Sequence, residues 1–553
     1  MAAATATAEG VLYTKDYETF QILDPVSDEP LTAFAGAKLA GKALPGDAVR
    51  MEGGCSLLAR ADHPPLSGVI ELASKTRYGM TSRGIPIYLF VPANRAYPPF
   101  IVGCSEKNTA ANQVALVKFD HWDAASQFPR GALQRLLGPV GSLAAEEEAL
   151  LWQYSPVTVH KEPGELAADD CPARVSLTGV TFNIDPVGCR DVDDVITVEL
   201  GSGARPNRIT ITIADVAARI AELSYQDTIA GIIGQTLYKD GAAVRPMLHH
   251  ALSEDALSLL PGKERLGVSL SFDWDGSKRT NFQWRETVLV NQKTYTYEEA
   301  AAAAAEPALA TFAAAMGGSA DAHVWIEEAM KLYNLEAAKL LVGAGVGILR
   351  AHAGPDLCRL EKYCRWDGGL AALASTAARY CHVGDAEQAH HGLGAAAYCH
   401  ATSPIRRYAD LMNQRLMKLI IRGKTKNLVV SVSLHDLNTR AKAAKAYERD
   451  LCYARALAAG TGHLVGRVLD CVDCGDGSVK LRIWAEAWRR TVTAIYKGVA
   501  TEGGGWLIKS RDEKMEFVVA EGDLVGIDYA ANMNARRWKE RLVIAVMPQP
   551  SDA

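Results

Sequence analysis

Short apolar runs separated by Gly, Pro and Asn dominate the first 160 residues of the chain. The runs at 85–91 and 114–119 have the composition of β-strands. Pro86 limits the first run to an edge strand or to a strand that starts after the proline. From about residue 461 the strand pattern returns, with glycines between the runs. Both regions therefore predict small β-barrels, and the C-terminal one predicts a five-stranded barrel of the OB type.

The middle of the chain, from about residue 173 to 460, mixes two periodicities. Apolar residues recur at helical spacing in 325–341 and 437–457, whereas 180–185 alternates apolar and polar residues as a half-buried strand does. The alanine run 300–305 is more typical of a helix or a connector than of a chemical site. The sequence therefore predicts a multidomain α+β protein with an α/β domain between β-rich regions.

Composition excludes several classes of protein. The chain has 553 residues, too many for one core, and 48% of them are apolar and 22% charged. A net charge of -5 excludes a uniformly basic nucleic-acid binder, so such a surface must be a local patch or channel. We expect no membrane span and, from the first five residues, no secretory signal. The 11 scattered cysteines suit free thiols, so we expect an intracellular protein, cytoplasmic or nuclear.

Four aspartates fall within ten residues, between the strand pattern that ends at residue 185 and a second one at 195–200. Pro186 and Gly188 force a turn there, so the carboxylates should lie close together on one loop. Such a group of like charges is unstable unless a cation neutralises it, and donors that are all oxygen suit Mg²⁺ or Mn²⁺ better than zinc. A solvated acidic turn is the alternative. The four residues are Asp185, Asp191, Asp193 and Asp194.

A pair of arginines precedes a second apolar pattern at helical spacing. Ser403 is a suitable N-cap and Pro404 a suitable first helical residue, so a helix is predicted to start here. Arg406 and Arg407 would lie in its first turn, where positive charge opposes the helix dipole at a cost of roughly 0.3–1 kcal/mol each. A bound phosphate would remove that cost. Pairing of the two arginines with local acids such as Asp410 is the alternative.

These two segments resemble the signatures of the ribonuclease II family, the exoribonucleases with an RNB catalytic domain. Residues 185–194 are similar to the acidic motif of the family, and residues 402–410 to its Thr-Ser-Pro-Ile-Arg-Arg-Tyr-x-Asp signature. The start of the first segment is most similar to the eukaryotic branch, which includes the catalytic subunit of the exosome. Further short matches lie in order at 213–216, 246–248, 327–330, 391–394 and 448–450.

The resemblance implies the order of the domains. Two cold-shock-like OB barrels would precede the RNB domain, and an OB-type RNA-binding barrel would follow it. We place the four domains at 1–75, 76–163, 164–460 and 461–549. Because no PIN endonuclease domain is found ahead of the barrels, we expect no association with the exosome, and we expect a monomer.

The resemblance also implies an activity, the Mg²⁺-dependent, processive 3′-to-5′ hydrolysis of single-stranded RNA to nucleoside 5′-monophosphates. The four aspartates would bind the metal, and Asp194 matches the one most closely tied to catalysis. Arg406 would contact the scissile phosphate, and Arg407, beside it, would also belong to the catalytic group. Further RNA contacts would come from Tyr238, Tyr297, Tyr408 and Glu448. The alternative is a catalytically silent RNA-binding regulator on the same fold, but such relatives lose aspartates from the acidic loop.

One more group of residues, in the C-terminal barrel, mixes aromatic and basic side chains. The pattern comprises Trp484, Trp488, Arg489 and Arg490, together with the segment 536–538. OB barrels bind single strands with such side chains, so we expect RNA contact here. Packing inside the barrel is the alternative.

Overall fold

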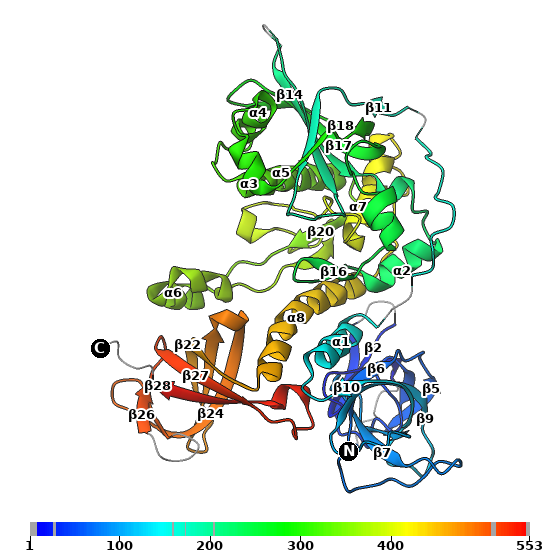
Figure 1. Ribbon diagram of the computed structural model, residues 1–553, viewed down its shortest axis with the longest axis vertical. Helices are drawn as coiled ribbons and strands as arrows, with labels where there is room; N and C mark the ends of the chain where they lie inside the picture. Colours follow the sequence, from blue (N-terminus) through cyan, green and yellow to red (C-terminus); the bar gives the residue numbers. More distant parts are fainter. Residues whose placement is uncertain are drawn as a thin grey trace, which may run out of the picture. The chain divides into compact units, whose positions relative to one another are not determined.

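A computed structural model describes residues 8–25, 29–156, 160–171, 173–202, 205–509 and 516–548. The first five residues, from which we expect no secretory signal, lie outside this description. The chain divides into two compact units, one of residues 1–156 with 445–553 and one of residues 157–444 (Figure 1). Within the described residues, every helix is too short or too polar to cross a lipid bilayer.

The N-terminal part of the first unit holds two β-structures. The first is a sheet of order β3-β2-β1-β4-β5, with β1 (Ala8–Thr14), β2 (Thr19–Leu23), β3 (Pro30–Ala35), β4 (Ala48–Met51) and β5 (Cys55–Ala59). The second is a closed barrel of order β10-β8-β7-β6-β9, with β6 (Leu66–Ile70), β7 (Ile87–Pro92), β8 (Phe100–Gly103), β9 (Gln113–His121) and β10 (Arg130–Pro139). Helix α1 (Leu143–Tyr154) follows the barrel.

This barrel bears on two predictions from the sequence, the role of Pro86 and the domain boundary at residue 75. Strand β7 begins at Ile87, directly after Pro86, so the proline marks a strand start and not an edge strand. Strand β6 lies before the expected boundary at residue 75, yet it pairs with β7 and β9. It therefore belongs to the second β-structure, because its backbone hydrogen bonds go there.

The C-terminal part of the first unit is a seven-stranded sheet of order β26-β25-β24-β23-β22-β27-β28. Its strands are β22 (Thr461–Asp473), β23 (Ser478–Ala485), β24 (Arg490–Ala500), β25 (Trp506–Lys509), β26 (Glu516–Val519), β27 (Leu524–Ala531) and β28 (Leu542–Pro548). Five strands were predicted. The sheet is larger because β24 continues into the β25–β26 hairpin.

The second unit is built on a seven-stranded sheet of order β11-β18-β17-β14-β13-β12-β19. Its strands are β11 (Val175–Ser176), β12 (Val180–Ile184), β13 (Asp194–Glu199), β14 (Asn207–Ala214), β17 (Glu264–Trp274), β18 (Arg279–Val290) and β19 (Lys293–Tyr295). Three helices gather beside this sheet and bury Phe312, Trp325 and Tyr333 against its strands (Figure 1). They are α3 (Tyr297–Ala302), α4 (Pro307–Ala315) and α5 (Ala322–Gly343).

Smaller elements complete the second unit. They are α2 (Tyr225–Ile233), β15 (Leu237–Lys239), β16 (Ala242–Arg245), β20 (Ile348–Ala351), α6 (Leu357–Trp366), β21 (Arg379–His382) and α7 (Tyr408–Ile421). Helix α8 (Leu434–Ala459) contains residues of both units. The helices predicted at 325–341 and 437–457 are confirmed as α5 and α8, as is the multidomain α+β class.

Candidate active site

The acidic loop connects two antiparallel strands, as the sequence predicts. Strand β12 pairs with β13 from Val180 opposite Val198 to Phe182 opposite Ile196. Asp185 follows β12 directly, and Asp194 is the first residue of β13. The turn between them uses Gly188 at a φ of 81°, a backbone angle that favours glycine. All four aspartates therefore stand on one short connection.

Two other segments fix the backbone of this loop. The hydroxyl of Ser258 accepts a hydrogen bond from the Val192 amide at 2.9 Å and donates one to the Arg190 carbonyl at 2.8 Å. The Ala214 amide donates to the Asp193 carbonyl at 2.8 Å. The sequence analysis did not predict this role of Ser258. The one signal in the sequence is a single serine within the apolar run 256–260, and its side chain is buried. Because three loop residues are held by backbone bonds, the carboxylates are positioned by a fixed frame.

Burial and mutual repulsion act together on the carboxylates. Burial raises the pKa of Asp193 to about 7. Burial also raises the pKa of Asp194, and the neighbouring charges of Asp185 and Asp193 raise it further. The pKa of Asp185 is raised by burial too, although the Asn183 amide donates to its carboxylate at 2.7 Å. A cation would relieve this repulsion.

The donor chemistry of the loop fits a hard divalent cation, because the available ligands are carboxylate oxygens. The expected ligand set is not preassembled, however. Across the described ranges, no three acidic, histidine or cysteine side chains converge as a ready-made metal cage. The reason is visible in the separate partners of the carboxylates: Asn183 binds Asp185, Arg406 binds Asp193, and the Tyr238 hydroxyl donates to Asp191 at 2.7 Å.

The arginine segment differs from the prediction. Helix α7 begins at Tyr408, so Ser403 is not its N-cap and neither arginine lies in its first turn. Instead, the amides of Arg406 and Arg407 both donate to the Ser403 carbonyl, at 3.2 and 2.9 Å, and form a turn. Arg407 is extended, with φ −134° and ψ 123°, because it forms a β-bridge with Gln235. This long-range pairing overrides the local helix signal.

The two arginines point to different partners. The Arg406 Nε atom lies 3.1 Å from Asp193 Oδ2, and 45% of the Arg406 side chain remains exposed. Arg407 instead forms two hydrogen bonds to Asp410, at 2.9 and 2.7 Å, and the Asp410 side chain is fully buried. Pairing with a local acid is therefore correct for Arg407, while Arg406 faces the acidic loop.

The four expected RNA-contacting residues lie in different surroundings. Tyr238, on β15, reaches Asp191. Tyr297 is the first residue of α3, and its pKa is raised to about 12 by burial and by the charges of Asp185 and Asp194.

The other two lie elsewhere. Tyr408 is buried in the core, and its hydroxyl donates to Asp227 at 3.0 Å, so it does not face the aspartates. The RNA contact expected of Tyr408 stays a prediction, and in this structure the ring packs in the core. Glu448 is an exposed residue of α8 that belongs to the other unit.

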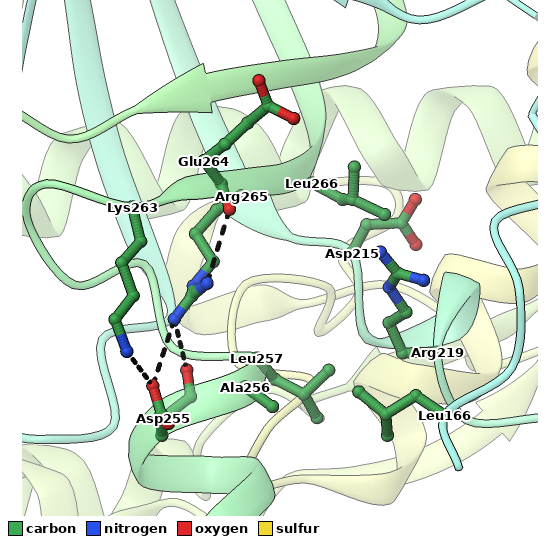
Figure 2. Close-up of a pocket in the computed structure, with 10 residues that line it drawn as sticks. All are labelled: Leu166, Asp215, Arg219, Asp255, Ala256, Leu257, Lys263, Glu264, Arg265 and Leu266. Carbon is green, nitrogen blue, oxygen red and sulfur yellow. Dashed lines mark hydrogen bonds and ion pairs between the residues drawn. The ribbon is translucent and has the colours of Figure 1, made fainter.

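A hollow of about 370 Å³ opens in the second unit, and its lining includes Ala256 and Leu257, which directly precede Ser258 (Figure 2). None of the four aspartates lines it. Its charged side chains bind one another: Lys263 and Arg265 both reach Asp255, at 2.7 and 3.3 Å. Arg265 also donates to the carbonyl of Ser258 at 2.8 Å. The charged residues that line this hollow therefore bind one another and the backbone at Ser258, and the hollow lies apart from the four carboxylates.

The aromatic and basic residues of the C-terminal sheet are largely occupied by packing. Trp538 is buried, and its indole donates to Glu146 at 3.0 Å. Arg490 pairs with Asp450 at 3.1 Å. The packing alternative therefore accounts for these two residues.

Comparisons with known proteins identify two domains in the chain. The family model described as RNB domain matches residues 174–317 and 370–423, and the model described as Dis3-like cold-shock domain 2 (CSD2) matches residues 87–155. The chain is 24% identical over 441 residues to the probable exosome complex exonuclease RRP44 of Caenorhabditis elegans, covering 62% of this chain and 46% of that protein. It spans from 46% to 62% of the length of the curated relatives first matched.

Two solved structures share the fold. Mycoplasma genitalium RNase R, in complex with ribose-methylated single-stranded RNA, aligns with a TM-score of 0.71 at 17% identity, over 98% of this chain and all of that one. Yeast Ssd1, described as a pseudonuclease, aligns with a TM-score of 0.63 at 14% identity, over 98% of this chain and 96% of that one. At these identities the likeness concerns the fold. The chain therefore contains an RNB domain and a Dis3-like cold-shock domain, and it is similar to exoribonucleases of the ribonuclease II (RNB) family.

Proposed function

We propose that this chain is a Mg²⁺-dependent exoribonuclease that hydrolyses single-stranded RNA processively from the 3′ end and releases nucleoside 5′-monophosphates. The observation that carries the proposal is the approach of Arg406 to the acidic loop, where its guanidinium meets Asp193. The carboxylates would hold a cation, and this cation and the guanidinium of Arg406 would act on the same phosphate. Neither group alone would indicate a phosphodiesterase.

Each side chain of the site has a task in this proposal. Asp185, Asp191, Asp193 and Asp194 would hold Mg²⁺, with Mn²⁺ as a substitute, and the metal when bound activates water and stabilises the leaving 3′ oxygen. Arg406 would donate to the non-bridging oxygens and neutralise charge that develops in the transition state. Tyr238 would orient Asp191 through its hydroxyl, and Asn183 would orient Asp185.

Arg407 has a different place in this proposal. Its bidentate bond to Asp410 fixes the turn that carries Arg406, and the amide of Ser403 donates to the same carboxylate at 2.9 Å. Arg407 would thus position its neighbour and would not contact the phosphate. The originally expected pair of phosphate-binding arginines becomes one ligand and one support.

The test is the incubation of the protein with 5′-labelled poly(A) RNA and Mg²⁺, with and without EDTA. If the labelled RNA becomes progressively shorter, and EDTA stops this shortening, the result supports the proposal. A DNA strand of the same sequence and an RNA with a blocked 3′ end are the controls, and both should stay intact. Internal cleavage, or digestion that proceeds in EDTA, would contradict the proposal.

The rival function is RNA binding without cleavage, on the same fold. Retention of all four aspartates in one loop, with Arg406 beside them, favours the enzyme. The same incubation separates the two, because a silent binder would retard the RNA in a gel and leave its length unchanged.

A further inference from the structure

An aromatic pair lies next to the acidic loop, and one of its two members, His323, has no place in the proposed chemistry. The rings of Tyr297 and His323 are nearly parallel, with 10° between their planes and 3.8 Å between their centroids. This geometry is face-to-face stacking at the spacing at which nucleobases also stack on aromatic side chains. The pair is formed by two residues that are 26 positions apart on different helices.

Both residues stand at the starts of their helices. Tyr297 is the first residue of α3, which Thr296 and Glu299 close with a complete capping box. His323 is the second residue of α5, and its amide and its Nδ1 atom both lie 2.9 Å from the N-cap carboxylate of Asp321. The backbone of Tyr297 and the ring of His323 are therefore held in place before any ligand arrives.

The position of the pair relative to the aspartates follows from the sheet. Strand β19 pairs in parallel with β12, and the Asp185 amide donates to the Tyr295 carbonyl at 3.0 Å. Tyr297 stands two residues beyond this bond. Its hydroxyl is also within electrostatic reach of Asp185, Asp194 and Arg406. The stacked pair thus borders the group that would act on the phosphate.

The pair is open on the side of the histidine, whose side chain is 61% exposed, whereas Tyr297 is half-buried. A surface beside four carboxylates repels phosphates, but a π-face binds a base without carrying charge. Since stacking does not depend on base identity, it suits an enzyme that degrades RNA of any sequence.

We propose that His323 is a positioning residue for RNA, which holds the Tyr297 ring in one plane so that the two rings form a platform for a nucleobase near the 3′ end. This inference rests on the proposed function for the identity of the ligand. It adds His323, a residue that no motif in the sequence singles out. The alternative is that the two rings only join α3 to α5.

The experiment measures RNA affinity in the background of Asp194→Asn, so that the strand stays intact. His323→Ala should weaken the binding of single-stranded RNA about five-fold or more, the lower end of the effect of removing one stacked ring. His323→Phe should restore the affinity because it keeps an aromatic ring at this position, although it loses the hydrogen bond to Asp321. His382→Ala is the matched control, as His382 is an exposed histidine of β21 in the same unit, and it should bind like the parent.

A second set of RNAs separates the platform from a structural role. Each RNA carries one abasic residue, at the first, second, third or fourth position from the 3′ end. At the position of the stacked base, the parent should lose affinity and His323→Ala should lose no more. An equal loss on every abasic RNA, no loss at all with His323→Ala, or a failure of His323→Phe to rescue would overturn the inference.

A failure of the platform inference can be told apart from a failure of the proposed exoribonuclease function. If wild-type protein binds RNA with the His323 dependence described but never shortens it, the platform stands and the exoribonuclease fails. If wild-type protein shortens RNA and His323→Ala leaves affinity unchanged, the exoribonuclease stands and the platform fails.

Discussion

The Nε atom of Arg406 lies 3.1 Å from the Oδ2 atom of Asp193, although 213 positions separate the two residues. The Asp193 carboxylate also accepts a hydrogen bond from the backbone amide of Ile405 at 3.1 Å. The arginine segment therefore binds Asp193 both through its backbone and through the Arg406 side chain. Asp193 is therefore the point at which the acidic loop and the arginine segment meet. A cation and a phosphate brought to this point would compete with, or replace, an ion pair that already exists.

Asp194→Asn should abolish hydrolysis while RNA affinity stays within a few fold of wild type. The substitution keeps the shape of the side chain and removes a charged oxygen donor from a group suited to a divalent cation. Hydrolysis is followed with labelled RNA, and affinity by fluorescence anisotropy. Asp62→Asn, which changes a side chain 90% exposed in the other unit, is the control for the loss of one charge. Loss of RNA binding along with activity would assign Asp194 a structural role.

Arg406→Ala should slow turnover by about 10²–10³-fold, the usual effect of removing one preorganised donor from a transition state. Arg406→Lys should recover only part of the rate, because an ammonium group cannot bind phosphate in bidentate fashion. The informative measurement is kcat together with KM on a short RNA. A rise in KM alone, with kcat unchanged, would show that Arg406 only holds the ground state.

Arg407→Ala should act on stability first. It leaves the fully buried Asp410 without its bidentate partner, which typically costs about 3–5 kcal/mol of unfolding free energy. The double variant Arg407→Ala/Asp410→Ala should be less destabilised than the sum of the two single variants. Thermal unfolding checks both, with Arg379→Ala as the control, since Arg379 pairs with Asp385 at the surface. A variant of normal stability that has lost only its activity would return Arg407 to the catalytic group.

Mg²⁺ should stabilise the folded protein, and EDTA should reverse the effect. The carboxylates repel one another when no cation is present, so binding favours the folded state, by about 2.7 kcal/mol at a concentration 100 times the dissociation constant. The measurement is the midpoint of thermal unfolding as Mg²⁺ is titrated. The shift should be absent from Asp194→Asn and retained in Asp62→Asn. A shift of the same size in both variants would place the cation somewhere else.

Ser258→Ala should weaken Mg²⁺ binding although Ser258 touches no proposed ligand. It deprives the Val192 amide of its acceptor, and an unsatisfied buried donor costs about 1–3 kcal/mol. The loop between Asp191 and Asp193 would then be held less firmly. The Mg²⁺ concentration that gives half-maximal hydrolysis should rise, whereas Ser56→Ala, an exposed serine of β5, should leave it unchanged. An unaltered Mg²⁺ requirement would mean that the other bonds to the loop suffice.

Local patterns in the sequence were enough to predict the elements that depend on near neighbours. Alternation of apolar and polar residues predicted β12, and Pro186 with Gly188 predicted the turn that brings the aspartates onto one loop. Helical spacing likewise predicted α5 and α8. These features depend on residues a few positions apart, so a single sequence contains the information.

The arginine segment shows where local reasoning stops. Ser403 and Pro404 have the chemistry of a helix start, but the bridge between Arg407 and Gln235 holds the backbone extended until Tyr408. Likewise, no spacing in the sequence shows that Arg406 turns to Asp193 while its neighbour turns to Asp410. Adjacent side chains separate because the extended backbone at Arg407 points them in different directions.

By itself, the sequence determined which chemical groups are present and that the carboxylates share one turn, because composition and short-range sterics act along the chain. Only the tertiary structure decided which arginine meets those carboxylates, that Ser258 supports their loop, and that His323 stacks on Tyr297. Each of these depends on the packing of segments 26 to 213 positions apart, and such contacts come from the whole fold and not from neighbouring residues.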